Sequence, residues 1–88
     1  METRVAVMSI IVEDKEAAER INMLLHEAGE YIIGRMGIPY RKRGISIISI
    51  ALDAPQDKIA ALSGKIGKLS GVSVKTAYSA VGGSEAGA

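Results

Sequence analysis

The residue types that could bind an anion are concentrated in one short segment of this 88-residue chain. Tyr40–Arg43 reads Tyr-Arg-Lys-Arg, the densest basic cluster in the sequence, and Gly37, Pro39 and Gly44 frame it. Arginine side chains, together with backbone amides near a glycine, can hold a carboxylate or a phosphate. The same pattern is also typical of a solvated loop whose charges discourage pairing at a sheet edge. The sequence leaves both interpretations open.

Two acidic residues and a further arginine extend this candidate site. Glu13 and Asp14 follow the first apolar run, at the start of an expected helix, and Arg35 lies just before the basic segment. We predict that a small-molecule or anionic effector binds among these residues at a boundary between subunits. The predicted effector-binding residues are Glu13, Asp14, Arg35, Gly37, Arg41 and Arg43.

A second stretch, Gly64–Ser70, combines glycine, lysine and serine in a way that superficially suggests a phosphate-binding loop. A P-loop requires glycine, four residues, Gly-Lys and then serine or threonine. Here Leu69 follows Gly67-Lys68, and Leu62 stands where the first glycine should be. Each glycine inside a helix costs roughly 1 kcal/mol relative to alanine. We therefore interpret Gly64 and Gly67 as close-packing positions, where the helix backbone lies against the sheet, another helix or a neighbouring subunit.

The sequence offers little for catalysis or for metal binding. His26 is the only histidine and there is no cysteine, so the ligands of a typical transition-metal site are missing. We find no pair of catalytic carboxylates and no histidine beside a nucleophile. We therefore expect no enzyme, no metal and no cofactor.

Composition narrows the cellular setting. The formal net charge of +1 gives no general attraction to nucleic acid or to an anionic membrane. The absence of cysteine excludes a disulfide framework and favours a cytoplasmic protein. The apolar run Val5–Val12 lacks the basic leader of a signal peptide, and no run approaches the roughly 20 apolar residues that span a bilayer.

Hydrophobic periodicity predicts four strands and two helices. Residues 4–12, 30–36, 45–52 and 72–79 either alternate with a period of two or are apolar on both faces, as strands are. The helices are marked by apolar stripes at Ala17, Ile21, Leu24, Leu25 and Ala28, and at Ile59, Leu62, Ile66 and Leu69. The order β-α-β-β-α-β predicts an α+β, ferredoxin-like sandwich over residues 1–79, with an antiparallel sheet in the order 4-1-3-2 and both helices on one face. Residues 80–88 are expected to form a flexible tail.

The helix ends carry recognisable signals. Asp14 is the expected N-cap of the first helix, and Gly29 and Gly71 are expected to close the two helices. Two alternatives remain for the start of the second helix. Asp53 and Gln56 could form a capping box, or Ala54 could be the cap with Pro55 at the first helical position.

The two strands that this order places in the middle, residues 4–12 and 45–52, are largely apolar on both faces. Two short helices can cover only one face of a four-stranded sheet, so the other face would expose several large apolar side chains. So large an exposed patch is unusual on a soluble monomer. We therefore predict that the chain forms a homo-oligomer, a dimer or a tetramer and most simply a two-fold dimer, by sheet-to-sheet or edge-to-edge association.

Several short motifs match those of a known family. They are Val12-Glu13-Asp14, Asn22 with Leu24-Leu25-His26, Arg35-x-Gly37-x-Pro39, and Ala61–Gly67 running into Ser70–Thr76. On these motifs residues 4–78 resemble the iron-only hydrogenase system regulators, small ACT-like proteins of ferredoxin-like fold. The resemblance implies regulation of a hydrogenase system at the level of transcription or of assembly.

Direct binding to nucleic acid does not fit the expected architecture. Both helices are needed to cover the sheet, so neither is available as a DNA-reading helix, and the central strands lack the aromatic residues that stack RNA bases. We therefore expect a protein partner and no direct contact with nucleic acid or membrane. The alternative hypothesis is a structural protein-protein interaction module that binds no ligand.

Overall fold

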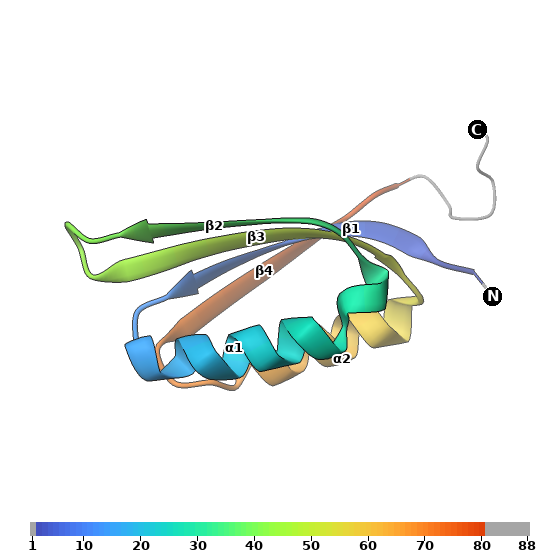
Figure 1. Ribbon diagram of the computed structural model, residues 1–88. Helices are drawn as coiled ribbons and strands as arrows, with labels where there is room; N and C mark the ends of the chain where they lie inside the picture. The colour runs from blue at the N-terminus through green and yellow to red at the C-terminus, as the bar shows by residue number, and fades with distance from the viewer. Residues whose placement is uncertain (1, 81–88) are drawn as a thin grey trace.

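The computed structural model describes residues 2–80, which form a four-stranded sheet packed against two helices (Figure 1). The elements are β1 (Arg4–Val12), α1 (Lys15–Glu27), the short 3-10 helix η1 (Gly29–Tyr31), β2 (Ile32–Tyr40), β3 (Ile45–Ala54), α2 (Gln56–Gly67) and β4 (Val72–Tyr78). Neighbouring strands are antiparallel in the order β2-β3-β1-β4. This is the predicted order 4-1-3-2 read from the other edge, so the ferredoxin-like fold is confirmed.

The core lies between the helices and one face of the two central strands. Alternate residues of β1 and β3 point into it, because successive side chains of a strand face opposite sides. The buried residues are Ala6, Met8, Ile10 and Val12 of β1; Ile48, Ile50, Leu52 and Ala54 of β3; Ala17, Ile21 and Leu25 of α1; and Ile59, Leu62 and Ile66 of α2. No polar or charged side chain is buried among residues 2–80, so any polar site on this part of the chain lies at its surface.

Strand β2 is longer than its sequence predicts. It continues past Met36 through Gly37 and Pro39 to Tyr40, and it pairs with β3 over this whole length. Proline is tolerated there because β2 is an edge strand, whose outer amides need no partner in the sheet. The turn at the end of the hairpin is therefore restricted to residues 41–44, and Arg41 and Arg43 lie in that turn.

The first helix begins as predicted and ends differently. The Asp14 side chain accepts a hydrogen bond from the Glu16 amide at 3.0 Å, which confirms it as the N-cap. The helix ends at Glu27 with Ala28 as its C-cap. Gly29 then starts η1 instead of adopting the left-handed conformation expected of it. The short extra turn brings Tyr31 back against the core.

Both predicted starts for the second helix are wrong. Asp53 and Ala54 still belong to β3, where they pair with Val5 and Arg4, and the N-cap of α2 is Pro55, which makes no side-chain cap. The helix also ends before the predicted last turn, at Gly67. Strand pairing with β1 therefore outweighs the local capping signals in this segment.

The connection that leads from β1 into α1 packs closely against the connection that leads from α2 into β4. The Glu13 amide, just before α1, donates a hydrogen bond of 2.7 Å to the carbonyl of Gly71, just before β4. Gly71 has φ +76°, the left-handed conformation that was expected of it. It lies three residues beyond Lys68, the C-cap of α2, so it does not close the helix itself. A Cβ at this position would lie 2.7 Å from the Cβ of Asp14. Only glycine fits both the backbone conformation and the space.

Neither helix of residues 2–80 is long and apolar enough to cross a membrane. Of the tail predicted at residues 80–88, all but Ala80 lie outside the described residues.

Candidate functional site

One face of the sheet is left uncovered by the described part of the chain. Figure 1 shows α1 and α2 together on one side of the sheet, with no described segment over the other side. Seven of the nine exposed large hydrophobic residues in the described chain lie on this uncovered side, which we call the open face. They are Val5, Val7, Ile11, Met36, Ile38, Tyr40 and Ile47. Their exposed fractions run from 37 % for Ile47 to 55 % for Met36, so each is only partly covered by its strand neighbours.

The register of the strands makes part of the open face continuous. Ile11 of β1 pairs with Ile47 of β3, and Ile47 pairs with Ile38 of β2, so three large aliphatic residues form a row across three strands. Ser9 and Ser49 pair in a neighbouring row, and Lys75 of β4 pairs with Ser9, so this row is polar and carries one charge. The face is therefore mainly apolar with few charges, which is typical of the core of a protein-protein interface.

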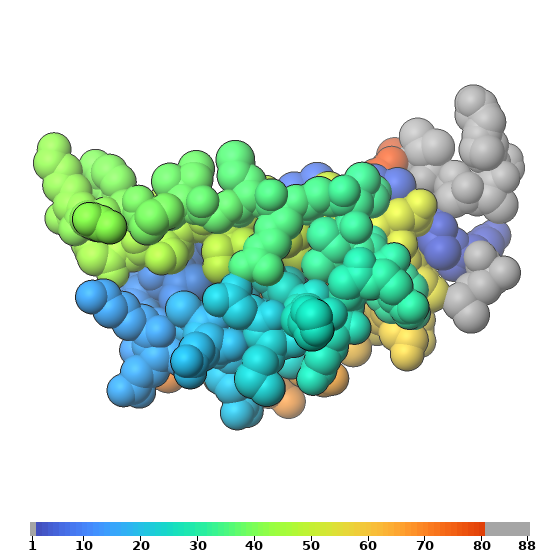
Figure 2. All heavy atoms as spheres, viewed as in Figure 1, coloured from blue at the N-terminus to red at the C-terminus, as the bar shows by residue number. Residues whose placement is uncertain are grey.

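Two of the predicted effector-binding residues come together at one end of this face. Glu13, which follows β1, and Arg43, in the hairpin turn, line the same shallow depression. Tyr40, Ile45 and Ile47 line it as well, so the depression continues into the open face. The turn projects beyond the start of α1, at the left of Figure 2. No ion pair joins Glu13 and Arg43 in residues 2–80, so both charges are available to a ligand.

The other predicted residues lie elsewhere. Arg35 pairs with the inward-facing Ile50, which places it on the helix side of the sheet, and its guanidinium donates a hydrogen bond to Asn22 Oδ1 of α1. Gly37 pairs with buried Ile48 and shares that side. The structure therefore separates both residues from the depression that Arg43 lines.

Asp14 and Arg41 also fall outside the depression. The Asp14 carboxylate caps α1, and its Cβ lies beneath Gly71. Arg41 lies in the hairpin turn but does not line the depression. Of the predicted set, the structure thus places only Glu13 and Arg43 together, and their effector-binding role stays a prediction.

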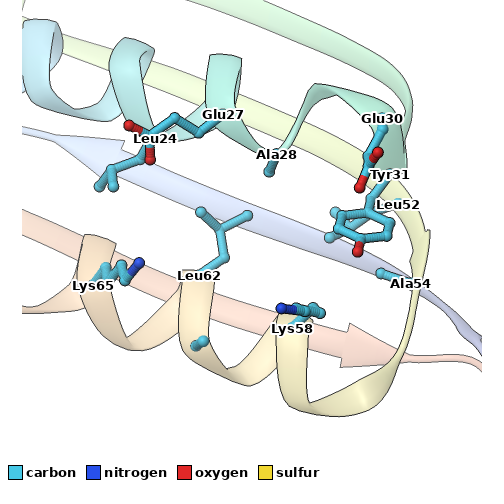
Figure 3. Close-up of a pocket in the computed structure, with 11 residues that line it drawn as sticks. Leu24, Glu27, Ala28, Glu30, Tyr31, Leu52, Ala54, Lys58, Leu62 and Lys65 are labelled. Atoms are coloured by element: carbon cyan, nitrogen blue, oxygen red, sulfur yellow. The ribbon is translucent and has the colours of Figure 1, made fainter.

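A groove between the two helices is a feature that the sequence reasoning missed. It has a volume of about 320 Å³ and is lined by residues of α1, η1, β3 and α2 (Figure 3). Leu52 and Leu62 are apolar lining residues, while Glu27, Lys58 and Lys65 bring charges to it. One sequence signal does point to it. Lys58 and Lys65 are seven residues apart, which places them on one face of α2.

Gly64 and Gly67 pack closely against no other element of residues 2–80. Apart from its chain neighbours and the backbone of its own helix, a Cβ added at either position would meet no heavy atom within 4 Å among the described residues. The prediction that these glycines pack against the sheet or the other helix is therefore wrong. Packing against a neighbouring subunit stays a prediction.

Gly64→Ala is accordingly expected to raise the free energy of unfolding by about 0.5–1 kcal/mol, because alanine restricts the unfolded chain and favours the helix. Urea denaturation measures the change. Ala60→Gly, at an exposed position one turn earlier in α2, is the matched control and should lower stability by a similar amount. A loss of stability in Gly64→Ala that grows with protein concentration would instead indicate a neighbouring copy against this helix.

Comparison with known proteins supports the fold and gives the family. No curated protein matches the chain. A solved structure, that of the uncharacterized protein TM1266 from Thermotoga maritima, is 41% identical, with a TM-score of 0.84, over 88% of this chain and 98% of that one. The model of the TM1266-like family, described as "Iron-only hydrogenase system regulator, putative", matches residues 4–76. This match runs from the start of β1 into β4 and so covers most of the βαββαβ unit. The chain therefore belongs to the TM1266-like family.

Proposed function

We propose that this chain is a non-enzymatic, homo-oligomeric regulatory domain of an iron-only hydrogenase system. The family description supplies the regulatory role. The observation that carries the oligomer is the open face, where seven large apolar side chains remain between 37 % and 55 % exposed. Burying a side chain of this kind fully is worth roughly 1.5–3 kcal/mol. A second copy of the same face offers complementary apolar surface, although Lys75, which pairs with Ser9, and Asp53, which pairs with Val5, bring one charge of each sign to this side of the sheet.

The regulatory action in this proposal passes through protein contacts. Both helices bury their apolar stripes against the sheet, so neither is free to enter a DNA groove as a separate recognition helix. The oligomer instead presents the outer surfaces of its helices and hairpin turns to a partner protein, in transcriptional control or in hydrogenase assembly.

The effector in this proposal binds in the depression between Glu13 and Arg43. A copy seated on the open face would lie beside this depression, because Tyr40 and Ile47 belong to both. Arg43 suits a carboxylate or phosphate group through charge-assisted hydrogen bonds. A thermal-shift screen of metabolites and anions tests this. A ligand that stabilises the wild type and the control Arg20→Gln, and not Arg43→Gln, supports the site. No response to any compound would favour the structural interaction module instead.

The regulatory role is tested in the source organism. Deletion of the gene is expected to change the transcript level or the activity of the iron-only hydrogenase, and the wild-type gene should restore it. A gene encoding Ile11→Glu on the open face should fail to restore it, whereas Met23→Glu on α1 should succeed. Unchanged hydrogenase transcript and activity after deletion would contradict the proposed function.

A further inference from the structure

We infer that the groove between α1 and α2 is a binding site for a small zwitterion, a molecule with an apolar body that carries one cationic and one anionic group. This site lies on the helix side of the sheet and is separate from the open face and from the depression at Glu13 and Arg43. It goes beyond the proposed function, because it requires neither oligomer formation nor hydrogenase regulation.

The groove has the size and the apolar lining that a small ligand requires. Its volume of about 320 Å³ falls at the lower end of the range of ligand pockets, about 300–1,000 Å³. Leu24 of α1, Leu52 and Ala54 of β3, and Leu62 of α2 supply apolar surface from three different elements, and Ala28, the C-cap of α1, adds to it. Small side chains at Ala28, Ala54 and Ala61 leave the space open between the helices.

The acidic and the basic residues of the groove lie on opposite sides of it. Glu27 of α1 and Glu30 of η1 bring two carboxylates from one side, and Lys58 and Lys65 of α2 bring two amines from the other (Figure 3). None of these four groups forms an ion pair within residues 2–80. The two walls thus carry unpaired charges of opposite sign on either side of an apolar lining.

Tyr31 adds a directional polar group at one end of the groove. Figure 3 shows its ring near Leu52 with the hydroxyl directed toward the α2 side. The ring packs against the core and is partly buried, which restricts its rotation. The hydroxyl makes no hydrogen bond within the described chain, so it can donate one to an anionic group that also contacts Lys58.

This arrangement selects against ligands of a single charge. A simple anion attracted by Lys58 and Lys65 is repelled by the two facing carboxylates, and a simple cation meets the reverse. A zwitterion can place its ammonium group toward Glu27 or Glu30 and its carboxylate toward a lysine, with its apolar part over Leu52 and Leu62. Both charges are then satisfied at once, which is the basis of the selectivity we infer.

Calorimetric titration with matched small molecules tests the site. The probes are L-leucine, L-phenylalanine and 6-aminohexanoate, which are zwitterions, with leucinamide, hexylamine and hexanoate as analogues that lack one charge. At least one zwitterion is expected to bind with a dissociation constant below about 10 mM, and the corresponding analogues at least about tenfold more weakly. No binding by any zwitterion, or equal binding by its analogues, would overturn the inference.

Substitutions at exposed positions locate the binding. Lys58→Gln and Glu27→Gln are each expected to weaken zwitterion binding about tenfold or more, the value of a charge-assisted hydrogen bond. Ala61→Leu should weaken it by filling the groove. Lys68→Gln, at the C-cap of α2, and Glu19→Gln, on α1, lie outside the groove, so they are the controls and should bind as the wild type does. Equal weakening in the control variants would overturn the site.

A further titration distinguishes failure of zwitterion binding from failure of the proposed oligomer. The titration is repeated with Ile11→Glu, whose substitution lies on the opposite side of the sheet from the groove. Unchanged zwitterion binding in this variant supports a site contained in one subunit. Loss of binding in Ile11→Glu, with its fold intact by circular dichroism, would overturn that assignment.

Discussion

Ile11→Glu is expected to abolish self-association of the protein while leaving the subunit folded. Ile11 is 42 % exposed on the open face, so in a single subunit the new carboxylate stays in contact with water. In the oligomer the same carboxylate would be buried against the apolar surface of another copy. An unpaired buried charge costs several kcal/mol, and about 4 kcal/mol corresponds to a thousandfold rise in the dissociation constant. Sedimentation velocity over a range of concentrations measures the change.

Met23→Glu is the matched control for this experiment. Met23 is also exposed, at 59 %, but it lies on α1, away from the open face. This variant should sediment as the wild type does. Equal loss of association in both variants would show that the effect of a new charge is general, and an unchanged Ile11→Glu oligomer would place the interface elsewhere.

Gly71→Ala is expected to lower the free energy of unfolding by about 3 kcal/mol or more. The left-handed backbone conformation costs a residue with a Cβ roughly 1–2 kcal/mol. At this position the Cβ would also lie 2.7 Å from Asp14 Cβ and 3.3 Å from the Asp14 backbone nitrogen, so the junction between the β1-α1 and α2-β4 connections must shift. Urea denaturation of the wild type and the variant measures the difference.

Gly44→Ala separates the two causes. Gly44 has φ +67° in the hairpin turn, but a Cβ there would meet nothing within 4 Å in the described structure. Its substitution should therefore cost only the conformational part, roughly 1–2 kcal/mol. If the two variants lose equal stability, the contact with Asp14 contributes nothing, and the account of this junction is wrong.

The sheet could be predicted from the sequence because its pattern is strong and local. The run from Arg4 to Val12 is β1 with the predicted bounds, and its buried residues occupy every second position. The apolar character of both faces of β1 and β3 also predicted that these strands lie in the middle of the sheet. Asp14 was recognisable as a cap because its role depends only on the residues that follow it.

The segments that differ are those where distant contacts outweigh local signals. Gly37 and Pro39 favour a loop, but their segment gains a full ladder with β3 and stays extended to Tyr40. Asp53 and Ala54 favour a helix start, but they pair with β1. In both places the partner strand decides the conformation, and a single segment carries no information about that partner.

The candidate sites were predictable only in part for the same reason. Because the strand was expected to end at Met36, the alternation that places Gly37 on the helix side could not be followed into the hairpin. The groove between the helices depends on how far α1 and α2 lie apart. That separation is set by the packing of both helices on the sheet and does not follow from the apolar stripe of either helix alone.

The central claim, that another copy covers the open face, is tested most directly by the reactivity of a single thiol. The chain has no cysteine, so Val7→Cys on the open face and Met23→Cys on α1 each provide a unique reporter. Cys labelling with a bulky maleimide should be slow for Val7→Cys at high protein concentration and should speed up on dilution, while Met23→Cys reacts rapidly throughout. Equal rates for the two variants at every concentration would contradict the account.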